Sequence, residues 1–240
     1  MLEFDLDGGG APPASFATLP AGRAIAESAL LILAAELHDD LSIANRTALA
    51  RAAAAQREGE SWITHVGMMS GRAGRPLRIN AGARSPAGLR AFAEAVGCDA
   101  PQCALFDTLL ALIHGLPLSL ILALDLDSGP LPRLGLECYA HPPENAAPAL
   151  LERLVGEGLC SPAQAEALLA WPEESGEGLA LIEPYRSLDA LLGPDGLAPL
   201  VRTLNHVKLV AEPGGAFEAK AYLGACYRPG RQSAATELAA

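Results

Sequence analysis

Hydrophobic residues recur at every second position in residues 119–127, the sequence SLILALDLD. Side chains alternate between the two faces of a strand, so one face carries only leucine, at positions 120, 122, 124 and 126. The other face mixes small, apolar and acidic residues, among them Asp125. After the turn SGPLP, the run RLGLECYA alternates in the same way, with Arg133, Glu137 and Tyr139 opposite its leucines. The two runs predict an antiparallel hairpin with one apolar and one polar face.

Two further stretches repeat this pattern. The runs WITHVGMM (62–69) and LRIN (77–80) flank a Gly- and Pro-containing turn, and Arg78 lies on the polar face of the second run. The stretch HVKLVAEPGGAFEAKAYL begins at residue 206 and contains two strand-like runs around EPGG. Lys208 lies in its first run, and Lys220 and Tyr222 lie in its second. Each predicted hairpin therefore carries at least one cation on its polar face.

Two helical segments precede each hairpin. Ser85 and Ser161 are typical N-cap residues, each followed by a proline at the first helical position. Composition, length and such capping residues predict helices over residues 24–37, 44–58, 86–96, 104–114, 147–155 and 162–171. The order helix, helix, hairpin thus occurs three times, which predicts an α+β protein built from repeated ααββ units.

Two arrangements of the hairpins fit this pattern. In the first, an open antiparallel sheet carries the helices on its apolar face and exposes its polar face to water. In the second, the sheet closes wholly or partly into a barrel with the helix pairs outside and the polar face inside. Small residues on the inner face, Ser119, Ala123 and Gly135, would then leave room for a ligand.

The chain is expected to form one main domain. Residues 21–228 contain all the periodic segments, and residues 1–20 and 229–240 are predicted to be a flexible N-terminal segment and a flexible tail. Residues 172–200 are acidic and rich in Gly and Pro, which predicts a linker-like insertion with one short helix over 187–192.

Composition narrows the classes of partner. The 240 residues are 50% hydrophobic, enough for a substantial core, and the formal net charge is −11. A negative field of this size repels nucleic acid and anionic membrane surfaces, so neither is expected as a partner, and an anionic ligand would need a local cationic pocket. Five scattered cysteines and an acidic, Gly-rich N-terminus favour a cytoplasmic protein, and the Ala, Leu, Gly and Pro content is typical of a GC-rich bacterial genome.

Metal-binding motifs do not stand out in the sequence. Cys98 and Cys103 have no matching second pair, and the histidines lack the HExxH spacing, so we predict no protein-bound metal site. Asp125 and Glu137 lie on adjacent predicted strands and are the candidate catalytic residues. These carboxylates could act as a general base or hold Mg²⁺ together with a diphosphate, or they could be charge partners for Arg133 and its neighbours.

The predicted arrangement resembles the ABBA-type aromatic prenyltransferases, also called PT barrels. The resemblance is carried by Lys220 and Tyr222 in KAYL, Lys208 in HVKL, Arg133 in RLGLE and Arg78 in PLRIN. In that family such residues hold the isoprenoid diphosphate, where convergent cations neutralise the leaving group. The chain departs from the family in having fewer predicted strands and only 5% aromatic residues.

The resemblance implies a transferase that moves an isoprenyl group from an allylic diphosphate to an aromatic or peptide side-chain acceptor. Tyr139 and Tyr222 would contact the substrate, because tyrosine faces can shield an allylic carbocation. Such enzymes belong to natural-product biosynthesis and peptide modification. The alternative is a non-catalytic accessory protein that binds a peptide or an anionic metabolite on the same polar face.

Overall fold

The computed structural model describes residues 2–3, 14–37, 41–71, 74–140, 143–174 and 200–227. Nine strands form one sheet in the order β1-β2-β3-β4-β5-β6-β8-β7, and β9 pairs with the other edge of β8. All pairings are antiparallel. The strands are β1 (Leu2–Glu3), β2 (Ala14–Thr18), β3 (Ser61–Met68), β4 (Leu77–Ala83), β5 (Leu118–Leu126), β6 (Pro130–Ala140), β7 (Glu173–Glu174), β8 (Leu200–Ala211) and β9 (Glu218–Tyr227).

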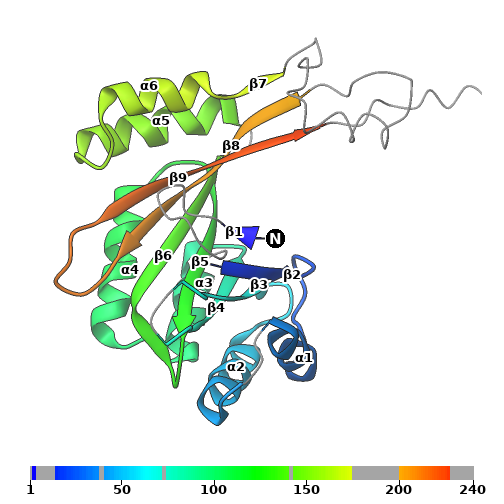
Figure 1. Cartoon of the computed structure of the whole chain (residues 1–240). Helices are drawn as coiled ribbons and strands as arrows, with labels where there is room; N and C mark the ends of the chain where they lie inside the picture. Colours follow the sequence, from blue (N-terminus) through cyan, green and yellow to red (C-terminus); the bar gives the residue numbers. More distant parts are fainter. Residues whose placement is uncertain are drawn as a thin grey trace, which may run out of the picture.

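The sheet curls into a half-barrel with its helices on the convex side (Figure 1). The helices are α1 (Glu27–Leu37), α2 (Ile43–Ala55), α3 (Pro86–Val96), α4 (Ala100–Leu112), α5 (Pro143–Gly156) and α6 (Pro162–Ala170). Within the described ranges, β1 pairs only with β2 and β9 only with β8, so the barrel is partial. The predicted α+β class is confirmed, and the concave face of the sheet is the polar one.

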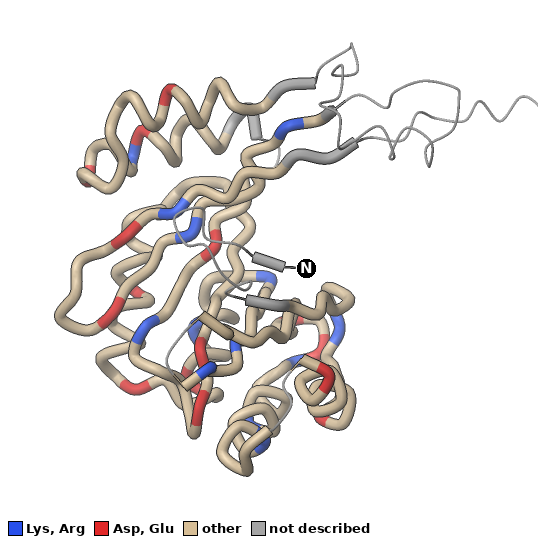
Figure 2. Tube along the Cα trace, in the orientation of Figure 1, with Lys and Arg blue, Asp and Glu red and all other residues tan. Residues whose placement is uncertain are grey.

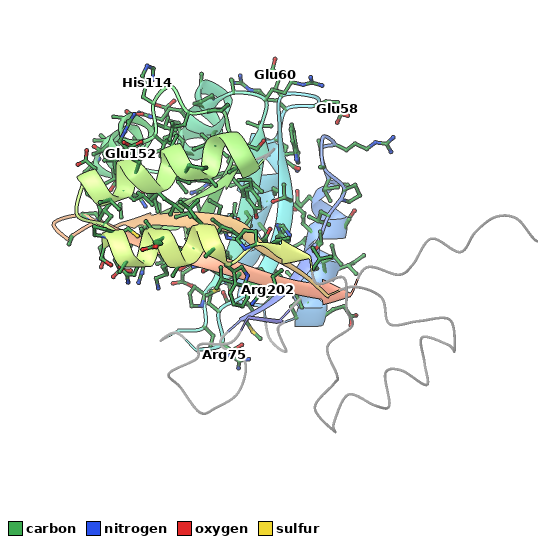
Figure 3. The ribbon with its side chains drawn as sticks, turned by 90° about the horizontal axis from the view of Figure 1, so that it is seen from above. Glu58, Glu60, Arg75, His114, Glu152 and Arg202 are labelled. Carbon is green, nitrogen blue, oxygen red and sulfur yellow. The ribbon has the colours of Figure 1, made fainter. Side chains whose placement is uncertain are left out.

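The three predicted ααββ units are present in chain order: α1-α2-β3-β4, α3-α4-β5-β6 and α5-α6-β8-β9. The last unit also has the short strand β7 before β8. Figure 3, turned by 90° so that α5 and α6 lie toward the viewer, shows these two helices running along β8. The repeat therefore describes the order of the chain, while the helices also cover strands of neighbouring units: α3 contacts β3, β4 and β5, and α4 contacts β6 and β8.

Local sequence explains where the helices begin and end. Ser85 and Ser161 cap α3 and α6 as predicted, and Gly97 ends α3 with a φ of 108°, which favours glycine. Helix α4 begins at Ala100, four residues earlier than predicted, because Asp99 and Gln102 form a capping box around Pro101. The capping box was visible in the sequence and is a better start signal than composition.

The core lies between the convex face of the sheet and the helices. Leu122, Leu124 and Leu126 of β5 are fully buried there, as the alternation predicted, and Leu120 is partly buried against the same cluster. Leu77 and Ile79 of β4 and Leu134 and Leu136 of β6 belong to the same core. The apolar faces of all three hairpins therefore point outward, toward the helices, and leave the polar residues inside the curl.

Strands β1, β2 and β7 and part of β8 lie outside the predicted strands. Residues 14–18 fall in the range expected to be a flexible lead-in, yet they form β2 and pair with β3 at four positions. β7 and the first residue of β8 fall in the expected linker-like insertion. The predicted helix over 187–192 and the expected tail at 229–240 lie outside the described residues. No helix in the described part of the chain is long and apolar enough to cross a bilayer.

Replacing Leu122 with Ala should lower the free energy of unfolding by about 2–5 kcal/mol, the usual cost of deleting a buried leucine side chain. Leu122 is 0% exposed within the core cluster. Urea denaturation of the variant measures this cost. The control is Ile32→Ala on α1, where the side chain is 63% exposed and a much smaller cost is expected. Equal costs for the two variants would mean that the convex face is not the core.

Candidate functional site

The polar faces of β6, β8 and β9 meet on the concave side of the sheet. In the strand register, Glu137 of β6 lies opposite Lys208 of β8, and Lys208 lies opposite Lys220 of β9. His206 of β8 lies opposite Tyr222 of β9, one pair further along. Acidic and basic positions consequently lie side by side on the strands of the curl (Figure 2).

Glu137 accepts hydrogen bonds from three side chains that come from three different strands. Lys208 Nζ and Asn80 Nδ2 both lie 3.0 Å from Oε1, and Tyr139 Oη lies 3.2 Å from Oε2. Glu137, Lys208 and Asn80 are all buried. A buried charge is tolerated when it is paired and its lone pairs are satisfied, and Glu137 meets both conditions.

The environment keeps Glu137 ionised. Burial alone would raise the pKa of this carboxyl, but the charge of Lys208 and the hydrogen bonds from Lys208 and Tyr139 outweigh burial and hold the pKa below its ordinary value. Burial, the negative charge of Glu137 and its hydrogen bond in turn raise the pKa of Tyr139 well above its ordinary value. Tyr139 therefore stays protonated at neutral pH and remains a donor to Glu137.

Arg78 and Asp125 form a second buried ion pair, one strand away from Glu137. Arg78 Nε lies 2.7 Å from Oδ1 of Asp125, and Nη2 lies 3.1 Å from Oδ2, which is a bidentate arrangement. The two residues are register partners on β4 and β5. Asn80 follows Arg78 on the same face of β4 and donates to Glu137, so β4 contributes one residue to each ion-pair group.

Arg133 and Lys220 share one partly exposed carboxylate, that of Glu218. Arg133 Nη2 lies 2.8 Å from Oε2 of Glu218, and Lys220 Nζ lies 3.9 Å from the same oxygen. The Lys220 side chain is 49% exposed. The structure thus explains how Lys208 and Lys220 can be direct cross-strand partners: Lys208 turns toward Glu137, and Lys220 remains at the surface beside Glu218.

Gly135 provides the space through which Lys208 reaches Glu137. A Cβ atom added to Gly135 would lie 2.5 Å from Cε of Lys208 and 3.5 Å from its Nζ. The sequence predicted that Gly135 would leave room for a ligand, and this is wrong, because the lysine side chain occupies the space. Ala123 lies next to the same position on β5, and Ser119 is exposed near the end of that strand.

His206 and Asn80 are residues of this face that the sequence did not single out as site residues. The ring of His206 stacks on Tyr222 at 4.3 Å between centroids and packs against Tyr139 at 4.7 Å, so it lies between two tyrosines. His206 is buried, and neither ring nitrogen has a hydrogen-bond partner within the described part of the chain. A buried unsatisfied polar group costs about 1–3 kcal/mol, so such a residue needs an explanation. Side chains two residues apart on a strand share a face, so the alternation that placed Lys208 on the polar face also places His206 there. This alternation is the sequence signal that could have identified His206.

The charge state of His206 follows from its surroundings. Burial lowers the pKa of the imidazole to about 4; the negative charge of Glu137 opposes this shift, and the positive charge of Lys208 adds to it. His65, on β3, also has a pKa below its ordinary value, chiefly because of burial. Both rings are therefore neutral at physiological pH, and neither adds positive charge to the concave face.

All eight predicted site residues lie on the concave side, but they divide into groups. Glu137, Lys208 and Tyr139 contact one another, and Tyr222 joins them through His206. Arg78 and Asp125 pair with each other, and Arg133 and Lys220 lie at Glu218. No group of three His, Cys, Asp or Glu residues in the described ranges could hold a metal ion. Asp125 and Glu137 already use their oxygens for protein partners, so binding Mg²⁺ would require these pairs to open.

Comparisons with models of protein families, with curated proteins and with solved structures found no match to this chain. The case for a function therefore rests on the residues of the concave face and on the arrangement of the strands and helices.

Replacing Gly135 with Ala should lower the free energy of unfolding by about 2 kcal/mol or more, because the new methyl group displaces Lys208 and leaves Glu137 buried without its cation. Urea denaturation measures the change. Gly129→Ala is the matched control in the same hairpin, since its Cβ would meet nothing closer than 3.8 Å. If the two variants are equally stable, Lys208 does not depend on the space at residue 135.

Acid should destabilise the protein through His206. Between about pH 7.5 and about pH 5 the unfolded chain takes up a proton at His206 that the folded chain does not, which lowers the free energy of unfolding by about 2 kcal/mol. His206→Phe should remove this part of the decrease in the free energy of unfolding, because a phenyl ring packs between the tyrosines and does not titrate. Urea denaturation at both pH values measures the difference, with the exposed His114→Gln as control. An unchanged pH dependence in His206→Phe would show that His206 is not held neutral.

Proposed function

We propose that this chain is a transferase that moves an isoprenyl group from an allylic diphosphate to an aromatic or peptide side-chain acceptor on the concave face of its half-barrel. The observation that carries the proposal is the polar interior of the curl. Three ααββ units wrap helices around an antiparallel sheet, and the inward-facing residues are cations, ionised carboxylates and tyrosines. This combination supports the prenyltransferase resemblance more than it supports an open sheet with a solvated face.

The donor diphosphate is proposed to bind beside Arg133 and Lys220. Arg78 and Lys208 each have a carboxylate of their own, whereas Arg133 and Lys220 share Glu218. Arg133 and Lys220 together therefore carry more positive charge than the single carboxylate of Glu218 neutralises. Both are partly exposed, so an anion can reach them without entering the buried network.

The chemistry has a defined course. A bond forms between the acceptor atom and the allylic carbon, the bond from that carbon to the diphosphate oxygen breaks, and the diphosphate leaves with the electron pair. The acceptor proton passes to a base, for which Glu137 is the candidate as the carboxylate held ionised on this face. Tyr139 and Tyr222 contribute ring faces near the developing cation. Mg²⁺, where required, would arrive with the diphosphate.

The charge balance of the same face favours a second candidate function. In the described part of the chain, four cations on the face, Arg78, Arg133, Lys208 and Lys220, contact three carboxylates, Asp125, Glu137 and Glu218, which is an excess of one positive charge in these contacts. A diphosphate carries more negative charge than this excess can neutralise. A non-catalytic accessory protein that binds a peptide or a singly charged metabolite would need less positive charge. The titration below separates the two candidates.

Calorimetric titration with pyrophosphate and with dimethylallyl diphosphate, with and without Mg²⁺, tests the proposal. Wild type should bind both, and Lys220→Ala should weaken binding about tenfold, the effect of losing one hydrogen bond to a charged group at a half-exposed site. Arg57→Ala is the control, because it removes a positive charge that pairs with Glu60 on an exposed surface.

Equal weakening by Arg57→Ala would attribute binding to overall charge and not to this site. No binding of either diphosphate by wild type at millimolar concentration would exclude the transferase and leave the accessory binding protein.

A further inference from the structure

We propose that the outer edge of β9 binds an extended peptide as an additional strand, with apolar side chains of the peptide in a cavity beneath α6 and an acidic side chain at Lys220. Within the described residues β9 pairs only with β8, so its other edge has no strand partner there. Extended peptides bind such edges through backbone hydrogen bonds, while pockets that receive alternate side chains provide specificity. The inference goes beyond the proposed function, because it does not require a transferase.

The two edge strands of the sheet differ in length. β1, at one edge, has two residues, whereas β9, at the other, has ten. Very short strands, prolines and bulges are the usual protection of a sheet edge against pairing with another chain. β9 contains no proline, and the register shift of its hairpin lies in β8, between Leu204 and His206. β9 is therefore regular and long enough to pair with a further strand.

A cavity of about 250 Å³ lies between α6 and the convex face of β9. Val207 of β8 and Leu151 and Leu154 of α5 line it and are buried, so they form its inner wall. Ala167 of α6 and Ala221 of β9 also line it and are exposed. The cavity thus opens between the helix and the outermost strand, and a ligand can enter it along the edge of the sheet.

The cavity exists because β9 carries small side chains where an inner strand carries large ones. On β5 the convex positions include Leu122, Leu124 and Leu126, which fill the space beneath the helices. On β9 they include Ala219 and Ala221. The volume is below the roughly 300–1,000 Å³ of small-molecule sites and suits one or two aliphatic side chains. Residues two apart on a strand share a face, so a peptide paired with β9 would bring two such side chains to it.

The residue between Ala219 and Ala221 sets the charge that the peptide should carry. Lys220 lies on the concave face, its side chain is 49% exposed, and its Nζ lies 3.9 Å from the carboxylate of Glu218, which Arg133 also contacts. Opposite charges on paired strands stabilise a sheet, and like charges destabilise it. The peptide residue between the two apolar ones is therefore expected to be acidic.

A second copy of β9 fits this edge less well than such a peptide. Antiparallel pairing of two β9 strands would place a second Lys220 on the same face, beside cations that already exceed the carboxylate they share. The partner that the edge fits is thus an extended segment of another protein in which aliphatic residues alternate with acidic ones.

The test is a fluorescence anisotropy titration of the full chain with a dye-labelled heptapeptide, blocked at both ends, in which three valines alternate with two glutamates between terminal serines. A comparison peptide has lysines in place of the glutamates. We expect the glutamate peptide to bind with saturation, about fivefold or more tightly than the lysine peptide. The formal net charge of −11 would favour the lysine peptide if overall charge decided binding, so this preference identifies the local cation.

Backbone methylation distinguishes strand addition from other modes of binding. Successive N–H groups of a strand point to opposite sides, so N-methyl groups on one alternate set of residues would face β9, and those on the other set would face away from it. One of these two methylated peptides should bind at least about tenfold more weakly than the parent, and the other should keep its affinity. Equal affinities of the two methylated peptides would overturn the strand addition.

Ala221→Leu should weaken binding of the glutamate peptide at least about tenfold, because the larger side chain occupies the cavity. Urea denaturation should show no loss of stability, since residue 221 is exposed. Ala104→Leu is the matched control, because Ala104 is exposed on α4 and does not line the cavity. Pyrophosphate affinity should be the same in Ala221→Leu as in wild type, because Arg133 and Lys220 lie on the opposite face of the sheet.

The peptide site is ruled out if the glutamate peptide does not bind at millimolar concentration, if the lysine peptide binds as tightly, or if the two leucine variants have the same affinity. Sedimentation of the chain alone tests the second copy: dimers that Ala221→Leu abolishes and Ala104→Leu keeps would assign the edge to self-association and overturn the peptide. Failure of pyrophosphate binding with intact peptide binding would overturn the transferase and keep the edge site.

Discussion

The ionised carboxylate of Glu137, buried in the concave face, is the constraint on which the rest of that face depends. A charge in such a place is unfavourable unless it is paired and fully hydrogen-bonded. Three strands meet this requirement with Lys208, Asn80 and Tyr139. The curl of the sheet brings β4 and β8 within reach of the same residue on β6, so the shape of the half-barrel and the state of Glu137 support each other.

The same constraint changes how the cations of this face are understood. Four cations inside a curled sheet suggest a polyanion site when they are read from the sequence. In the structure, two of them are committed to buried carboxylates, and the other two share a third. Among the described residues of this face, the paired charges are therefore close to balance, and the buried polar atoms without a partner belong to the neutral side chains of His206 and Asn80.

Much of the fold could be predicted, because alternation and capping are local properties of the chain. The leucines of β5 and the caps at Ser85 and Ser161 reveal hairpin faces and helix starts without any knowledge of neighbouring strands. β2 was missed because a run of five residues, ASFAT, carries too little pattern to distinguish it from a loop. Its pairing with β3 is a long-range contact and has no local signal.

The site was harder to predict because its contacts join residues that lie far apart in the sequence. Alternation placed Glu137, Lys208 and Tyr139 on one face, but it could not show that Asn80, 57 positions away from Glu137 in the sequence, would donate to it.

The close packing of Lys208 over Gly135 has a consequence for how this chain can evolve. The lysine crosses β6 only where the glycine leaves the backbone bare, so neither position can change freely while the other is kept. A lineage that acquires a side chain at 135 is expected to shorten residue 208 and to neutralise residue 137 as well, replacing the charged trio by an apolar one. Substitutions at these three positions should therefore be inherited together, and a relative that retains one member of the trio should retain all three.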